Sequence, residues 1–421
     1  MTDPLGWGGY GASLARARER TGTDESVVCG REKFGGHEAM VIRFEFGFLG
    51  GSVGTGTGAR IERALAEARS LGLPVVSLLS TGGTRMQEGV PALRQLQRIA
   101  RGLVLLREAR LPHITVARQP TTGGVWASLG ADADVVLGVP GAQVGFAGRR
   151  VRPERFADDP AYTAESQYTA GYVDELVTED VLAARLEGWL GLLTGGGNLP
   201  AEVPRALGAL EPAPDGWQAV LRARSADRPR AGVYLDDYFD LRGTLRGGTE
   251  DGVLCGIGTR GGRSIAFAAQ TGTATTPAGF RSATRLIRLA DRLGLPVLTL
   301  VDTPGADAGP AAETAGAGHA IAELFGTVAA AVVPITTLVI GEGGSGGALA
   351  LCSADRIWLT PDAYFSVIAP ELAAGILKRE PADVPALAGD LKLRPEELLA
   401  LGVVDGIAGP AAIDLVSTPP G

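Results

Sequence analysis

The sequence predicts an α/β protein made of two copies of one domain, and two observations carry this prediction. LGLPVVSLLSTGG (71–83) and LGLPVLTLVDTPG (293–305) are near copies of each other, 222 residues apart. LPHITVARQPTTGG, which begins at 111, and VPITTLVIGEGG, which begins at 333, have the same separation. A fixed distance between similar segments indicates a repeated structural unit. We therefore expect two related domains of about 200 residues each.

Each copy alternates amphipathic helices with short apolar runs, which is typical of a parallel sheet covered by helices. In both copies, the first helix is followed by a glycine, Gly72 or Gly294, at the position of a helix C-cap. The Leu-Pro-Val segment after each glycine begins a buried strand rich in β-branched residues. The helices that we expect are 59–71 and 91–110 in the first copy, and 280–293 and 313–332 in the second.

Composition places the boundary between the two domains. Residues 195–216 include nine glycines or prolines in 22 positions, which predicts a linker between domains at 1–194 and 217–421. The first 25 residues have little apolar periodicity, and we expect them to form a loose arm.

Charge and composition exclude several classes of function. The chain carries 39 basic and 47 acidic residues, so a basic face for nucleic acid or an anionic membrane is not expected. Three cysteines and three histidines, all far apart, predict neither a disulfide framework nor a metal site. The longest apolar run, 327–340, contains Pro334 and is too short for a membrane span. No signal pattern begins the chain, so we expect a cytoplasmic protein.

Glycine pairs between a strand and a helix are the features that best predict chemistry. Gly82-Gly83 and Gly123-Gly124 each follow a predicted strand in the first copy. Glycine lets backbone N–H groups at a helix start approach a ligand closely, so two such turns can form an oxyanion hole. The second copy has corresponding turns in DTPGADAG and GEGGSGGALA, where Gly346-Gly347 indicates an offset of 223 and a one-residue insertion.

Other readings of these residues are weaker or stay open. The glycines could serve helix–strand packing alone. A P-loop would need a lysine after the glycines, and a dinucleotide-binding motif would need an acidic residue about 20 positions on. Ser345 does not lie in a G-x-S-x-G nucleophile motif. We interpret His319 as a structural helix residue and Asp302 as a cap for the turn after its strand.

At these residues the sequence resembles the carboxyltransferase component of biotin-dependent acyl-CoA carboxylases, in the crotonase superfamily. STGGTRMQEG, PTTGGVWAS and VGFAGRRV resemble the β subunit of bacterial acetyl-CoA carboxylase. PAGFRSATRLIRLADR, VDTPGADAG and YFSVIAPE resemble its α subunit. The resemblance implies two tandem crotonase-like (ββα superhelix) domains, the first binding acyl-CoA and the second biotin. The zinc ribbon of the β subunit has no four-cysteine counterpart here.

The resemblance implies transfer of a carboxyl group from carboxybiotin to the α-carbon of an acyl-CoA such as acetyl-CoA or propionyl-CoA. In the family, carboxybiotin releases CO2, and the resulting anion takes a proton from the thioester, whose enolate attacks CO2. The implied oxyanion residues are Gly82, Gly83, Gly123 and Gly124 for the thioester, and Gly346, Gly347 and Ala348 for the biotin ureido oxygen. The implied substrate-binding residues are Arg85, Trp126, Phe146 and Gly305.

The implied partners are a biotin carboxyl carrier protein and a biotin carboxylase on separate chains, and a second copy of this chain in a homodimer or hexamer. Two alternatives remain at this point. The uncharged QTGTATT (270–276), where the α family has basic residues, is compatible with a biotin-independent decarboxylase of a malonyl-type thioester. A non-catalytic paralogue, with Trp126 filling the acyl pocket, is the other.

Overall fold

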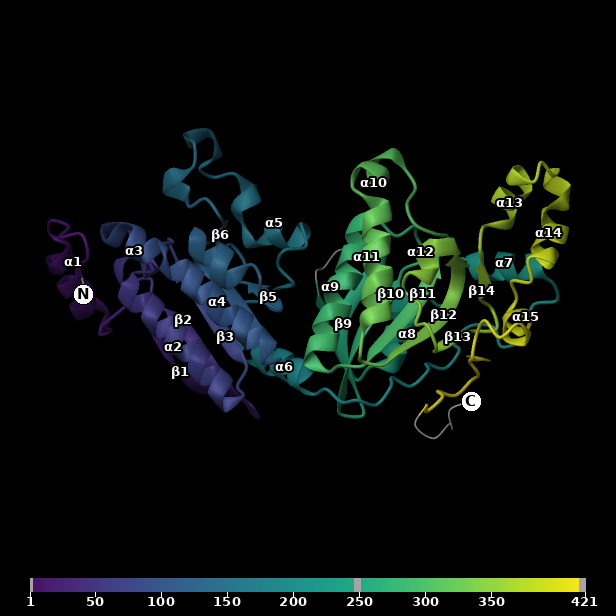
Figure 1. Ribbon diagram of the computed structural model, residues 1–421, viewed down its shortest axis with the longest axis horizontal. Coiled ribbons are helices and arrows are strands. Elements are labelled where there is room, and N and C mark those ends of the chain that lie inside the picture. The colour runs from purple at the N-terminus through teal and green to yellow at the C-terminus, as the bar shows by residue number, and fades with distance from the viewer. Residues whose placement is uncertain (1–2, 246–250, 416–421) are drawn as a thin grey trace. The chain divides into compact units, whose positions relative to one another are not determined.

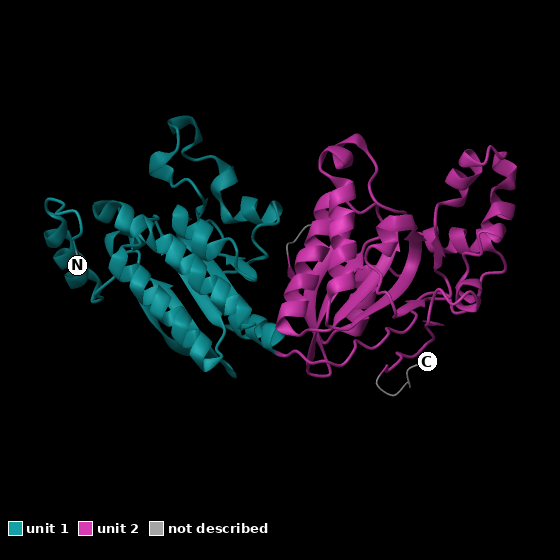
Figure 2. Ribbon diagram, viewed as in Figure 1, with its two compact units in different colours: residues 1–194 teal, residues 195–421 magenta. Residues whose placement is uncertain are grey.

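The computed structural model describes residues 3–245 and 251–415. The chain divides into two compact units, Met1–Thr194 and Gly195–Gly421 (Figure 2). Each unit has one sheet with helices packed against it (Figure 1).

The sheet of the first unit has seven strands in the order β1-β2-β3-β4-β5-β7, with β6 paired to β4. The β1–β2 pair is antiparallel and the other pairs are parallel. The strands are β1 (Val27–Phe34), β2 (His37–Phe44), β3 (Val75–Thr81), β4 (His113–Thr122), β5 (Val135–Gly138), β6 (Val144–Gly145) and β7 (Glu175–Leu176).

Helices α2 and α4 pack together over this sheet (Figure 1). In α2, buried Ile61, Leu65 and Ala68 recur every three or four residues, so one face of the helix enters the core. The helices are α1 (Tyr10–Thr21), α2 (Thr55–Leu71), α3 (Gly89–Leu93), α4 (Gln95–Glu108), α5 (Ala164–Thr169), α6 (Leu182–Thr194) and a π-helical turn at Trp126–Gly130.

Over the described part of the second unit, the sheet has eight strands in the order β15-β13-β12-β11-β10-β9-β8, with β14 paired to β12. Its strands are β8 (Leu241–Leu245), β9 (Val253–Arg260), β10 (Arg263–Gln270), β11 (Val297–Thr303), β12 (Ile335–Gly344), β13 (Ile357–Leu359), β14 (Tyr364–Ser366) and β15 (Gly406–Ile407). Its helices are α7 (Gly216–Arg224), α8 (Ala231–Tyr238), α9 (Pro277–Leu293), α10 (Pro310–Thr314), α11 (Ala317–Ala330), α12 (Ser345–Leu349), α13 (Pro370–Ile376), α14 (Val384–Asp390) and α15 (Pro395–Ala400).

The two sheets share one strand order, apart from the additional β8. Their registers also correspond: Val75 pairs with His113 in the first unit, and Val297 pairs with Ile335 in the second. Each strand pair has an irregularity at the same place, between Leu79 and Thr81 or between 301 and 303. All of these equivalent positions are 222 residues apart, so the sequence repeat is a repeat of strand pairing.

The predicted helices exist, with two differences. Gly72 and Gly294 have φ of 67° and 71° and cap α2 and α9, as expected. The single helix expected at 91–110 is instead the pair α3 and α4, and the one expected at 313–332 is the pair α10 and α11. Gly316, with φ of 79°, separates α10 from α11, because this left-handed conformation cannot continue an α-helix.

The expected loose arm is wrong. Within residues 1–25, α1 buries Tyr10, Leu14 and Ala17 in a small cluster with Phe48. The helix has only one narrow apolar stripe between arginines, which is why its pattern was too weak to predict a packed helix.

The linker expected at 195–216 is also packed. Ala201, Val203 and Ala206 belong to the main hydrophobic core of the second unit, and Ala213 lies in a second cluster. Val203 forms an antiparallel bridge with Ile413. Prolines and glycines here produce an extended segment that runs along the unit, since they exclude helix and leave apolar side chains free to pack.

Leu14→Ala tests the packing of α1. Truncating a leucine that is 5% exposed should lower the free energy of unfolding by about 2 kcal/mol, the low end for such changes because the cluster is small. Urea unfolding of the full chain measures it. Ala15→Ser, on the exposed side of α1, is the control and should change it by less than about 0.5 kcal/mol. Equal effects of the two substitutions would contradict the packed helix.

Candidate active site

Two glycine turns meet in the first unit, as predicted. Gly83 (φ 110°) follows β3, and Gly123 (φ 78°) follows β4. A Cβ added to Gly123 would lie 2.9 Å from the Cα of Gly83, closer than real side chains allow. Both the positive φ angles and the backbone contact therefore require glycine.

Most of the predicted N–H donors of this site are already used. The Gly82 N–H donates to the Gly50 carbonyl at 2.9 Å, and the Gly83 N–H donates to Thr81 Oγ1 at 3.0 Å. The Gly123 N–H donates to the Phe146 carbonyl at 3.0 Å. These three N–H groups thus donate within the protein. Gly124 stands at the first helical position, where a helix supplies no acceptor for its N–H.

The other expected substrate-binding residues of the first unit lie in different surroundings. The Trp126 side chain is 6% exposed and packs in a core cluster with Val136 and Val144, so it does not fill a surface pocket of this unit. The Phe146 side chain is 71% exposed, on the residue whose carbonyl accepts from Gly123.

Arg85, which we expected to bind substrate, is the centre of a buried ionic network. Its guanidinium donates to Glu25 at 2.8 and 2.9 Å and to Glu88 at 3.1 Å, and its side chain is fully buried. Tyr10 donates to Glu88 at 2.6 Å, and Glu88 also accepts from the N–H of Thr55 at 2.7 Å. The network fixes the segment after Gly83 to α1 and α2.

Glu25, Tyr10 and Glu88 were not among the site residues predicted from the sequence. Glu88 had a local signal, because it lies three residues after Arg85 in STGGTRMQEG. Tyr10 and Glu25 are 75 and 60 residues from Arg85, and no local spacing relates them to it.

The second unit repeats the first turn. The Gly305 N–H (φ 146°) donates to Thr303 Oγ1 at 3.1 Å, as Gly83 does to Thr81. Gly347 lies against the same turn, and a Cβ there would collide with the backbone N of Ala306. Gly305 and Gly347 are thus brought together, as predicted.

The expected one-residue insertion is wrong. Thr121 pairs with Thr81, and Gly343 pairs with Thr303, so the offset of 222 continues into the second turn. The equivalent of Gly123 is then Ser345, which has the same unusual positive φ, 56° against 78°.

This register makes Gly346 the equivalent of Gly124. A Cβ added to Gly346 would meet no heavy atom within 4 Å, so its backbone faces open space. The backbone of Gly347 packs against the Gly305–Ala306 turn, and Ala348 is fully buried.

Asp302 does not cap its turn, contrary to our interpretation. It is completely buried, forms ion pairs with Arg228 and with Arg230 (3.1 Å), and accepts from the Glu342 N–H at 3.1 Å. It therefore fixes the end of β12, two residues before Gly344.

Arginines reach the end of this sheet from outside the uncharged 270–276 segment. Arg224 pairs with Glu342 at 2.8 Å and with Glu371, and Tyr364 donates to Glu342 at 2.9 Å. The hydrogen bond from Arg224 holds the pKa of Glu371 below its usual range. Within 270–276, Gln270 is buried and donates to the Gly347 carbonyl at 3.0 Å.

Comparison with known proteins decides the family. Residues 3–174 match the carboxyl transferase domain family, and residues 210–412 match the acetyl co-enzyme A carboxylase carboxyltransferase-like family. The acetyl-coenzyme A carboxylase carboxyl transferase subunits beta/alpha of Salinispora arenicola are 39% identical over 96% of this chain and 77% of that protein. The chain belongs to the acyl-CoA carboxylase carboxyltransferase family.

A second relative is the probable biotin-dependent acyl-coenzyme A carboxylase beta3 subunit of Mycobacterium bovis, 34% identical over 94% of this carboxyltransferase and 82% of that protein. The crystal structure of transcarboxylase 12S, a hexamer with methylmalonyl-coenzyme A and methylmalonic acid bound, matches with a TM-score of 0.76. It is 22% identical and covers 92% of this chain and 79% of that chain. The two units of the carboxyltransferase thus have the expected crotonase-like fold.

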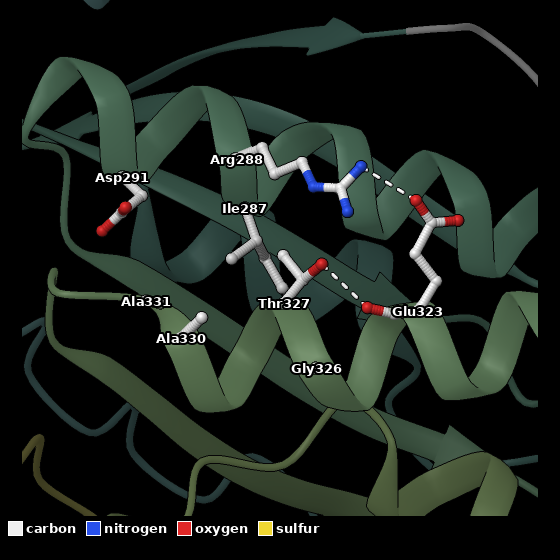
Figure 3. Close-up of a pocket in the computed structure, with 8 residues that line it drawn as sticks. All are labelled: Ile287, Arg288, Asp291, Glu323, Gly326, Thr327, Ala330 and Ala331. Carbon is white, nitrogen blue, oxygen red and sulfur yellow. Dashed lines mark hydrogen bonds and ion pairs between the residues drawn. The ribbon is translucent and has the colours of Figure 1, made fainter.

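A surface pocket of about 370 Å³ between α9 and α11 is not part of either glycine site (Figure 3). Arg288 and Glu323 form an exposed ion pair across it at 2.9 Å. Asp291 accepts from the backbone N–H of Val332 at 2.7 Å. These contacts join α9 to α11 and to the segment after it, and they bring no nucleophile or base to a strand end.

Over residues 3–245 and 251–415, no group of three or more His, Cys, Asp or Glu side chains could hold a metal ion. None of the helices in that same part of the chain is both long enough and apolar enough to span a bilayer.

Glu25→Gln tests the network around Arg85. Burial alone would raise the pKa of Glu25, but hydrogen bonds and charge from Arg85 outweigh it and hold that pKa below its usual range. The network therefore stabilises the carboxyltransferase fully above the ordinary glutamate pKa, and less as pH falls through the lowered value. Removing this charge should lower the free energy of unfolding at neutral pH by about 3 kcal/mol.

The measurement is urea unfolding between pH 3 and 8. The wild type should lose stability toward acid more steeply than Glu25→Gln does. Glu32→Gln, which breaks a half-exposed pair with Arg43 at 2.8 Å, is the control and should cost less than about 1 kcal/mol. Parallel acid profiles for wild type and Glu25→Gln would contradict this role for Arg85.

Proposed function

We propose that this carboxyltransferase moves a carboxyl group from carboxybiotin to the α-carbon of an acyl-CoA such as acetyl-CoA or propionyl-CoA. The observation that carries the proposal is the pair of equivalent backbone sites, one in each unit, at Gly124 and Gly346. Both place an N–H group at a helix start beside a glycine turn. Such groups stabilise an oxygen that gains negative charge, and the reaction develops charge on two oxygens.

In the first unit, the Gly124 N–H would donate to the thioester oxygen as an enolate forms. The N–H is fixed in advance, because the adjoining Gly83–Gly123 contact has no side chain that could move. The hydrogen bonds of Arg85 to Glu25 and Glu88 hold the segment that follows Gly83. A donor that needs no rearrangement during the reaction is the efficient way to lower such a barrier.

In the second unit, Gly346 would hold the ureido oxygen of biotin. A Cβ added to Gly346 would meet no heavy atom within 4 Å, and an N–H group is the right partner for a ureido oxygen. Bound carboxybiotin supplies the carboxyl group that is transferred. Asp302 and Gln270 keep the Gly346 turn in place through β12 and the Gly347 carbonyl.

Partners form part of the same proposal. A biotin carboxyl carrier protein and a biotin carboxylase would be separate chains, as the resemblance implies, and the protein would act in the cytoplasm without a metal. A homodimer or hexamer would bring the two kinds of site together. The hexameric transcarboxylase 12S, which shares the fold, supports a higher assembly.

The alternative is a biotin-independent decarboxylase of a malonyl-type thioester. The observation that favours it is charge balance at the second site, where Asp302, Glu342 and Glu371 already pair with the nearby arginines.

Matched glycine substitutions separate the two functions, with malonyl-CoA decarboxylation measured with and without free biotin. Gly124→Val should lower turnover under both conditions by roughly 10²–10³, the cost of one oxyanion donor. Its added Cβ meets only the end of the Leu96 side chain, so folding should survive. Gly346→Val should abolish only the biotin-dependent rate.

Gly318→Ala is the control, because its Cβ points into open space on α11, and it should keep the wild-type rates. Turnover that ignores biotin and survives Gly346→Val would establish the decarboxylase. If both valine variants fold and keep near-normal rates, the glycines serve packing and both site assignments are wrong.

A further inference from the structure

An open pocket of about 770 Å³ in the second unit contains a buried carboxyl group that the proposed reaction does not use. The pocket is formed by residues 207–211, the end of α7 with the segment up to Pro229, and Asp362 between β13 and β14. Its apolar walls are Leu207, Leu210 and Pro229.

Asp362 is 4% exposed, and among the described residues its Oδ1 atom has no hydrogen-bond partner. The backbone at Gly208 covers the other carboxyl oxygen so closely that any side chain there would collide with it. A buried carboxylate without a partner is costly, which is why such groups normally pair with a cation or a donor.

The neighbouring polar groups of the pocket do not supply that partner. Arg228 is paired with Asp302 and donates to the Ile340 carbonyl at 3.1 Å. Arg222 donates to the Glu211 carbonyl at 2.8 Å. The hydroxyl oxygen of Tyr234 accepts from the Leu207 N–H at 3.1 Å, and burial, together with the nearby charge of Asp362, raises the Tyr234 pKa to about 12.

We infer that this pocket binds a small aliphatic primary ammonium compound, whose nitrogen donates to Asp362 Oδ1 and whose hydrocarbon lies on Leu207, Leu210 and Pro229. An ammonium group has three donors and a positive charge, so it satisfies the unpaired oxygen and offsets the buried charge. The exposed carboxyl groups of Asp227 and Glu211 at the rim favour a cation at the entrance.

Isothermal titration calorimetry of the full chain tests this inference with isopentylamine and L-leucine, which share a branched hydrocarbon and an ammonium group. At least one should bind at millimolar concentration, and isopentanol, which has no ammonium, should not. Tighter binding of leucine would assign the site to amino acids, with Arg222 taking the carboxylate. Tighter binding of isopentylamine would assign it to simple amines.

Asp362→Asn keeps the shape of the side chain and removes its charge. It should weaken binding roughly tenfold or more, since a charge-assisted hydrogen bond is lost. Asp227→Asn, at the exposed rim, is the matched control and should change affinity by about twofold at most. Without ligand, the Tm of Asp362→Asn should equal or exceed that of the wild type, because an uncompensated buried charge is removed.

Three results would overturn the inference: no binding of either amine by the wild type, equal binding by Asp362→Asn, or a Tm several degrees lower in the ligand-free variant. The last would mean that the carboxyl group has a partner within the protein. None of these measurements depends on biotin or acyl-CoA, so they stand or fall separately from the carboxyl-transfer proposal.

Discussion

Contact between two backbone turns, with no side chain between them, is the constraint on which each unit's site depends. In the first unit the contact joins Gly83 to Gly123, and in the second it joins the Gly305 turn to Gly347. Parallel pairing of the preceding strands brings the turns to one edge of the sheet. The register shift after Leu79 is repeated 222 residues later, just before each turn. A single methyl group at the contact would push the two turns apart. Glycine is therefore required at these positions because there is no room for a side chain.

Behind each contact lies a buried ionic network, and the two networks are not copies. The first unit uses an arginine after its turn, Arg85, paired with Glu25 between α1 and β1 and with Glu88 three residues further on. The second uses an aspartate before its turn, Asp302, held by arginines that follow α7. The duplicated backbone has thus kept its glycine geometry while the side chains that support it have diverged. A buried charge can be paired by residues from any part of the fold. A close contact between two backbones, in contrast, allows only glycine.

The sequence predicted the features that local chemistry determines. The repeat, the strand–helix alternation and the glycine caps of α2 and α9 follow from spacing and from the conformations that glycine permits. The packed α1 and the packed 195–216 segment could not be predicted, because their stability comes from distant residues such as Phe48 and Ile413. Aligning the two Gly-Gly pairs in the sequence gave an offset of 223. The strand register instead makes Ser345 the equivalent of Gly123, and this serine has the positive φ that usually requires glycine. The acceptors of the Gly82 and Gly123 N–H groups, at Gly50 and Phe146, could not be predicted because they come from other segments of the chain.

The segment that begins the second unit has a consequence for how such a chain can be divided into two polypeptides. Its backbone bonds to residues 409–413, Val203 to Ile413 and Ala206 to Gly409, and the Ala201 carbonyl accepts from Thr336 on β12. The opening residues of the second unit are therefore held to residues 409–413 by backbone hydrogen bonds. A gene split that yields two folding products must fall before Gly195, although the glycines and prolines that follow look like the natural place to cut.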